Sequence, residues 1–153
     1  MQTPWVHQQS TKGGPGAGGA QVGAPSGPPP NVNPSGDVKQ WVAQAMQILQ
    51  KDGVDMSKVR EQDIELMIQK ESSGDPKAQN NWDSNAKKGT PSKGIMQTID
   101  STFNSFKSAG HGDIWNPVDN IVAAVKYSLS RYGSTANVPG IKSTGQGGAY
   151  KGY

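Results

Sequence analysis

The first 36 residues differ so strongly in composition from the rest of the chain that they limit where a hydrophobic core can form. They contain seven of the 11 prolines and eight of the 20 glycines, and Lys12 is their only charged residue. The stretch 21–30 has no hydrophobic period, so it buries too little apolar surface to offset the entropy lost on ordering it. We therefore predict a disordered Gly/Pro-rich linker or tail over residues 1–36 and one folded domain over residues 37–153.

Apolar residues recur at helical spacing in four segments of that domain, and each segment carries residues that favour a helix start or a helix end. The expected helices run from a cap at Asp37 to about Lys51, from about Glu61 to Lys70, from Asp100 or Ser101 to about Lys107, and from Pro117 to about Tyr132. No alternating apolar and polar pattern of any length favours a β-sheet. The sequence therefore predicts a mainly α-helical domain.

The segments between these helices are rich in turn-forming residues. Residues 72–93 form the longest such segment, and a loop of this length in a compact domain is often a binding loop. Residues 94–99 are expected to form a short strand or an extended segment. The end of the chain, residues 143–153, is Gly-rich and offers little beyond Tyr150 and Tyr153 to pack against a core.

Composition also bears on several classes of function. The net charge is only +3 and no basic run is present, so we do not expect a nucleic-acid partner. The chain has no cysteine, which excludes disulfides, thiol nucleophiles and zinc–thiolate sites. No window approaches the ~18 apolar residues of a membrane span, and residues 1–10 do not have the pattern of a signal peptide. No histidines or acids have metal-ligand spacing, so we expect neither a metal nor a cofactor.

Glu71 is the acid whose position is hardest to explain by folding alone. It lies three residues after Ile68 and seven after Ile64, which places it on the apolar face of the second helix. Partial desolvation favours the protonated form of a carboxyl group, and a glycosidase needs such a neutral acid to protonate a leaving oxygen. The alternative is that Glu71 reaches water at the helix end and has no role.

Three motifs follow one another in the chain: Glu71-Ser72, then Gly94-Ile95-Met96-Gln97, then Asn120-Ile121 with Ala124 and Tyr127. This order resembles the soluble lytic transglycosylase (SLT) family of the lysozyme-like superfamily, and the resemblance covers about residues 38–140. The second motif has isoleucine where the family has leucine, and alanine occupies the small position of the third. The segments 81–85 and 89–94 are closest to forms in actinobacterial secreted proteins and phage tape-measure proteins.

The resemblance implies a role for each matching residue. Glu71 is expected to protonate the bond between N-acetylmuramic acid and N-acetylglucosamine, and then to deprotonate the muramic acid C6 hydroxyl. A 1,6-anhydro ring results, with the substrate's N-acetyl group assisting in place of a second carboxylate. Ser72 is expected to orient the acid or the substrate, or else to cap the following turn. Met96 and Gln97 are expected to line the cleft, and Tyr127 to hydrogen-bond Glu71; on residue type alone, Met96 could equally be core.

Two residues of the long loop complete the expected site. Trp82 is expected to stack on a sugar ring, unless it covers the edge of the core. Asp83 is expected to lie near the substrate, where it would activate water in an enzyme that hydrolyses the bond, or else to form an Asx turn. The alternatives to a transglycosylase are therefore a muramidase and a catalytically inactive wall-binding module.

The resemblance also extends to fold, partner and location. It implies a lysozyme-like α+β domain, mainly helical, in which the long loop forms a substrate cleft. The expected partners are peptidoglycan glycan strands, bound by a monomer. The expected location is extracellular, at the cell wall, or in a virion that meets the wall.

Overall fold

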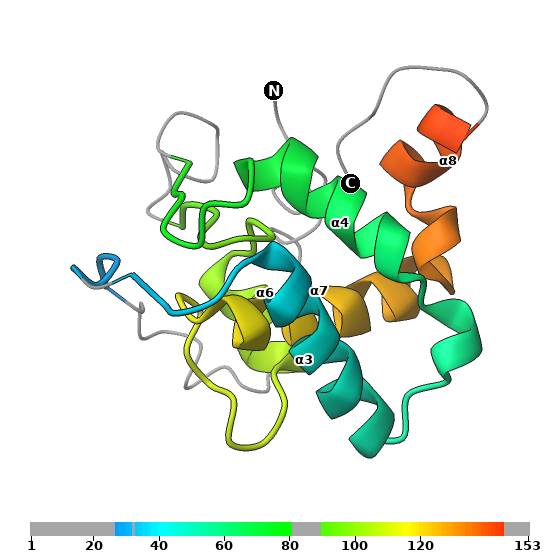
Figure 1. The fold of residues 1–153 in the computed structure, drawn as a ribbon, viewed down its shortest axis with the longest axis horizontal. Coiled ribbons are helices and arrows are strands. Elements are labelled where there is room, and N and C mark those ends of the chain that lie inside the picture. Colours follow the sequence, from blue (N-terminus) through cyan, green and yellow to red (C-terminus); the bar gives the residue numbers. More distant parts are fainter. Residues whose placement is uncertain (1–26, 32, 81–89, 146–153) are drawn as a thin grey trace.

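The computed structural model describes residues 27–31, 33–80 and 90–145. In chain order, the elements of these residues are α3 (Val38–Lys51), η1 (Met56–Lys58), α4 (Glu61–Ser72), α6 (Asp100–Phe106), α7 (Pro117–Tyr132), η2 (Thr135–Asn137) and α8 (Pro139–Gly145) (Figure 1). Extended pairing among the described residues is limited to three isolated bridges. The prediction of a mainly helical domain is confirmed.

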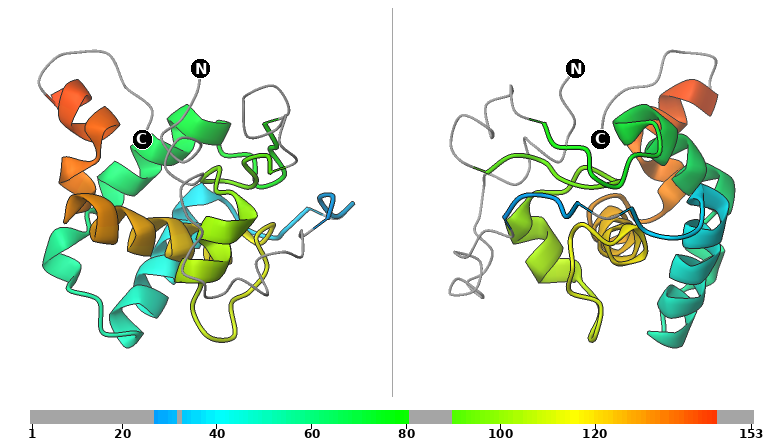
Figure 2. Two further views of the ribbon diagram at one scale, coloured as in Figure 1. Left: turned by 180° about the vertical axis from the view of Figure 1, so that it is seen from behind. Right: turned by 60° about the vertical axis from the view of Figure 1, so that its left-hand side comes forward.

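Helix α7 is the centre of the domain. It is enclosed on several sides, with α3 and α6 lying on either side of it when it is viewed end-on (Figure 2). Its start follows the sequence expectation, because the Asn116 side chain accepts hydrogen bonds from the backbone N–H groups of Val118 and Asp119, and Pro117 occupies the first turn. Gly133 ends the helix in a left-handed conformation with φ of 90°.

Helix α3 begins at the predicted cap. Asp37 accepts a hydrogen bond from the backbone of Gln40, whose side chain bonds back to the Asp37 backbone, so the pair forms a complete capping box. One face of α3 then enters the main core through Val42, Ala45 and Leu49, none of which is exposed. Helical spacing in the sequence was therefore a reliable guide to this element.

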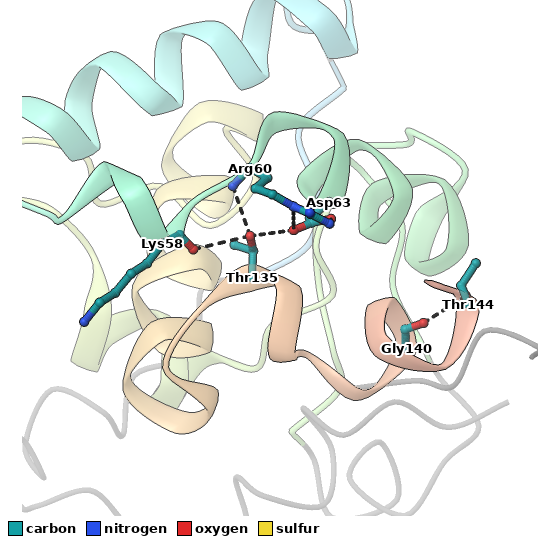
Figure 3. Close-up of polar contacts among 6 residues, drawn as sticks. All are labelled: Lys58, Arg60, Asp63, Thr135, Gly140 and Thr144. Carbon is teal, nitrogen blue, oxygen red and sulfur yellow. Dashed lines mark hydrogen bonds and ion pairs between the residues drawn. The ribbon is translucent and has the colours of Figure 1, made fainter. Parts of the chain in front are cut away.

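A polar cluster, in which Asp63 and Thr135 are buried, connects the beginning of α4 to η2 (Figure 3). Arg60 donates two hydrogen bonds to Asp63, at 2.7 and 2.8 Å. The Thr135 hydroxyl lies 2.8 Å from Asp63 Oδ2 and accepts a hydrogen bond from the Arg60 backbone N–H at 3.0 Å. Because Asp63 is only 3% exposed, these contacts satisfy a carboxylate that would otherwise be costly to bury.

Two segments differ from the sequence expectation. Residues 94–97 form a turn between bridged residues rather than a strand, because partners far along the chain fix their backbone, as described below. Helix α8 was not expected, since the Gly-rich composition from Ser143 onward hid it. Pro139 favours a helix start, and Val138 and Ile141 are buried in the main core, so tertiary packing holds this short helix.

The segment before α3 contacts the folded domain at two points. The Trp41 indole N–H donates to the Ser35 carbonyl at 2.9 Å, and the Trp115 indole N–H donates to the Gly27 carbonyl at 3.2 Å. Pro34 and Ser35 also form one wall of a cavity of about 290 Å³ beside Trp41. The boundary predicted at residues 36 and 37 stays a prediction, but Gly27, Pro34 and Ser35 are in contact with the domain.

Candidate active site

Glu71 lies in the last turn of α4, which ends at Ser72, two residues beyond the helix end expected from the sequence. Glu71 as a whole is half-buried, and one of its two carboxyl oxygens, Oε1, is fully buried. The helix ends immediately afterwards, because Ser73 adopts a left-handed conformation with φ of 55°. Glu71 is therefore held on a rigid helix at the point where the chain leaves it for the loop.

The second motif forms a short hairpin. Lys93 and Thr98 exchange two backbone hydrogen bonds, of 2.7 and 3.0 Å, and Gln97 N–H donates to the Gly94 carbonyl at 3.1 Å. Gly94 has a φ of +84°, and a Cβ atom there would lie 2.4 Å from Asn120 Nδ2. Only glycine fits this position, because both the backbone angle and the contact exclude a side chain.

Asn120 of α7 is completely buried and holds this hairpin through hydrogen bonds of its side-chain amide. Its Oδ1 accepts a hydrogen bond from the Met96 backbone N–H at 2.9 Å. Its Nδ2 donates toward the carbonyl oxygens of Lys93 and Ile114, at 3.2 and 2.9 Å, and toward Thr98 Oγ1 at 3.2 Å. The first residue of the third motif thus fixes the backbone of the second.

Ser72 connects the hairpin to the helix that carries Glu71. Its hydroxyl donates to the Ile95 carbonyl at 2.7 Å, with Ile68 O at 3.3 Å, and accepts a hydrogen bond from the Gly74 N–H at 3.2 Å. The bond from Gly74 stabilises the turn after α4, in agreement with the alternative expectation for Ser72, and a role in orienting the acid or the substrate stays a prediction. Its hydroxyl hydrogen is directed to the protein backbone.

Gln97 has a structural reason that the sequence did not reveal. Its backbone φ is +56°, which is strained for a residue with a side chain. The side-chain Nε2 donates to the carbonyls of Ala78 and Gly94, at 3.0 and 2.9 Å, and the residue is 5% exposed. Gln97 therefore joins the hairpin to the loop that follows Glu71, and contact with a sugar stays a prediction.

Met96 and Tyr127 are both buried. Met96 has no exposed surface and belongs to the main core, as its residue type alone suggested; its contact with substrate also stays a prediction. The Tyr127 ring packs edge-to-face on Phe106, with 5.7 Å between ring centroids. Burial raises the pKa of the Tyr127 hydroxyl above its ordinary value of 10.0, so it remains a hydrogen-bond donor at neutral pH. The expected bond to Glu71 is a prediction.

The two loop residues of the expected site, Trp82 and Asp83, lie outside the described residues. Sequence reasoning also overlooked a cluster beneath the hairpin, formed by Lys93, Asp100 and Trp115. The Lys93 ammonium lies 2.9 Å from Asp100 Oδ2 and 5.9 Å from the centroid of the Trp115 ring. The only available signal was a lysine directly before the second motif, and a lysine in a loop is usually solvated.

Metal and membrane features can be assessed for the part of the chain that the structure describes. No group of three or more histidines and acids there could hold a metal ion. None of the helices in this part is long and apolar enough to cross a membrane. Glu71 supplies a carboxyl group, a type of group that can transfer protons, on a helix end that Ser72 joins to the hairpin.

Comparison with known proteins agrees with the three motifs. A family model described as the transglycosylase SLT domain matches residues 48–151. The chain is 50% identical over 119 residues to YqbO, an uncharacterized protein of Bacillus subtilis (strain 168). The matched region makes up 78% of this chain but only 7% of YqbO. No solved structure shows significant similarity. Because the family match spans more than half of the sequence, the chain belongs to the transglycosylase SLT domain family.

Proposed function

We propose that this domain is a peptidoglycan lytic transglycosylase. It cleaves the β-1,4 bond between N-acetylmuramic acid and N-acetylglucosamine and leaves a 1,6-anhydromuramic acid end. The observation that carries the proposal is the position of Glu71, in the last turn of α4 with one carboxyl oxygen buried and with Ser72 bonded to the hairpin motif. Membership of the SLT family supplies the substrate class.

The reaction needs two proton transfers, and one carboxyl group performs both. Neutral Glu71 first protonates the glycosidic oxygen, so that the C1–O bond breaks and N-acetylglucosamine leaves. The substrate's N-acetyl oxygen stabilises the positive charge at C1. The Glu71 carboxylate then takes the proton of the C6 hydroxyl, whose oxygen bonds to C1 and closes the anhydro ring. The acid ends the cycle protonated, as it began.

The surroundings of Glu71 suit this sequence. Burial of one oxygen favours the neutral acid that the first step requires. In the second step the acid is transiently a carboxylate, and the Tyr127 hydroxyl, which stays protonated, donates the hydrogen bond that holds it. Met96 and Gln97, both buried, support the floor of the site from inside the domain. Ser72 orients the helix end, and Trp82 supplies a stacking face for a sugar.

Partner and location follow from the substrate. The partner is the glycan strand of peptidoglycan, bound by one copy of the domain. The site of action is the cell wall or the extracellular space, reached by secretion or as part of a virion. The matched part of the Bacillus subtilis relative is a small fraction of a much longer protein, so this domain also fits the role of a cleaving module within a larger chain.

Substitution of Glu71 by Gln tests the assignment, because it keeps the shape of the side chain and removes proton exchange. We expect cleavage of purified peptidoglycan to fall at least about a hundredfold, the usual contribution of a general acid. Sedimentation with peptidoglycan should be unchanged. Glu65→Gln is the matched control on the same helix, since Glu65 pairs with Lys39 on the exposed side, and it should retain activity.

The outcomes separate the rival functions. Near-native cleavage by the Glu71→Gln variant would remove Glu71 from the reaction. Asp83→Asn distinguishes the two enzymes, because a transglycosylase has no need of a second carboxylate and should keep its rate. A thousandfold loss in that variant would favour a muramidase that activates water with Asp83. Binding without cleavage by the unmodified protein would favour a wall-binding module.

A further inference from the structure

Lys93, at the base of the hairpin, is a buried cation, and the proposed reaction gives it no role. Its side chain is 5% exposed, and its ammonium pairs with the carboxylate of Asp100, which is 15% exposed, at 2.9 Å. Trp115 presents its ring to the same ammonium, with 5.9 Å from Nζ to the centroid. Asp100 is the first residue of α6, and Trp115 lies just before α7, so the cluster joins the hairpin to two helices.

Stability alone is a poor explanation for this pair. Removing a lysine and an aspartate from water costs free energy that their attraction does not always recover, and apolar residues of similar volume are often at least as stabilising. A charged pair differs from an apolar pair in being directional, because the ammonium must meet the carboxylate at hydrogen-bond distance. Such a contact fixes the position of the segments that carry the two charges.

The segment that Lys93 carries leads directly to the acid. The backbone of Lys93 closes the hairpin through its two bonds to Thr98 and is itself held by Asn120. At the other end of the hairpin, the Ile95 carbonyl accepts the hydrogen bond from Ser72, the residue next to Glu71. A displacement of the hairpin base therefore reaches Glu71 through one backbone turn and one hydrogen bond.

We infer that Lys93 is a positioning residue for the reaction. Its ion pair with Asp100, covered by the Trp115 ring, fixes the hairpin, and the hairpin fixes the end of α4 that presents Glu71 to the glycosidic oxygen. This inference rests on the proposed function, since it assigns to Lys93 a part in the same site. It requires the pair for catalytic geometry rather than for folding.

The test replaces both charges, so that neither is left buried without its partner. The double variant Lys93→Met/Asp100→Asn is compared with the matched double variant Lys126→Met/Asp52→Asn, which removes a pair of 2.8 Å from the outer side of the domain. Initial rates on soluble, uncrosslinked glycan strands give kcat and KM, with anhydromuropeptides counted by mass spectrometry. Thermal unfolding of each variant shows whether it is folded.

We expect the Lys93/Asp100 variant to lose kcat by about tenfold or more with KM within about twofold of wild type, because displacements of about 1 Å can cost a hundredfold in rate. The control pair should keep both parameters. Wild-type kcat in the folded Lys93/Asp100 variant would overturn the inference. If that variant does not fold, Asp100→Glu, which keeps both charges but displaces the carboxylate by one methylene group, must still lower kcat, and an unchanged kcat would overturn the inference equally. Failure of the wild type itself to form anhydro products would instead overturn the proposed function.

Discussion

Substitution of Gly94 by Ala should destabilise the domain far more than the same change at an open glycine. At Gly94 a Cβ atom would lie 2.4 Å from Asn120 Nδ2 and 2.8 Å from the Ile114 carbonyl, at a φ of +84°. Neither neighbour can yield easily, because the Asn120 amide is completely buried and bonded to three backbone groups, two in the hairpin and one at Ile114. The added methyl group must therefore displace the hairpin from α7.

The expected magnitude has two parts. A side chain in the left-handed region costs about 1–2 kcal/mol. Displacing the Asn120 amide leaves one or two buried polar groups without their bonds, at about 1–3 kcal/mol each. Together these predict that Gly94→Ala lowers the free energy of unfolding by roughly 3–5 kcal/mol, or the melting temperature by roughly 10–20 °C.

Gly110 provides the matched control. Its φ is +81°, and nothing lies within 4 Å of the position that a Cβ atom would take. Gly110→Ala should therefore show only the backbone part of the cost, about 1–2 kcal/mol. Urea denaturation followed by tryptophan fluorescence measures both variants by linear extrapolation. Equal destabilisation by the two substitutions would refute the claim that the contact between Gly94 and Asn120 holds the hairpin.

Three further predictions concern stability. Thr135→Val removes the hydroxyl that bonds Asp63, so thermal unfolding should show a loss of about 1–3 kcal/mol; no loss would mean that Arg60 alone satisfies the carboxylate. Lys126 and the Ser108 hydroxyl hold the pKa of Asp52 below its ordinary value of 3.8. The stability that Asp52 contributes is present above that value and is lost as the pH falls through the folded-state pKa. Asp52→Asn should therefore be less stable than wild type at neutral pH, and the difference in stability should disappear in acid. A difference that does not change with pH would contradict this. Deleting residues 1–26 should leave the melting temperature within about 2 °C of wild type. Deleting residues 1–36 should lower it by roughly 5 °C, because the indole hydrogen bonds of Trp41 and Trp115 are lost. Equal melting temperatures of the two truncated proteins would show that these bonds contribute nothing.

The parts of the fold that follow from neighbouring residues could be predicted from the sequence. The capping box at Asp37 and the start of α7 at Asn116 and Pro117 each depend on side chains within three residues of the helix start. Helix α8 could not be predicted in this way, because buried Val138 and Ile141 hold it against distant segments. The Gly-rich composition from Ser143 onward gave no local indication of a helix.

The same division holds for the candidate site. The helical position of Glu71 followed from its spacing to Ile64 and Ile68. The hairpin did not, because the left-handed φ of Gln97 is imposed by hydrogen bonds from its side chain to Ala78 and Gly94. Nor did the positions of Lys93 and Asn120, whose partners come from segments that the chain brings together only on folding.

The chemical form of the released ends tests the proposed reaction most directly. Purified peptidoglycan is digested with the wild-type domain, and the muropeptides are measured by mass spectrometry. A lytic transglycosylase yields products ending in 1,6-anhydromuramic acid, lighter by one water than the hydrolysed sugar, and this is the expected result. Products ending in reducing muramic acid would contradict it, since they would show that water, rather than the C6 hydroxyl, attacks the sugar.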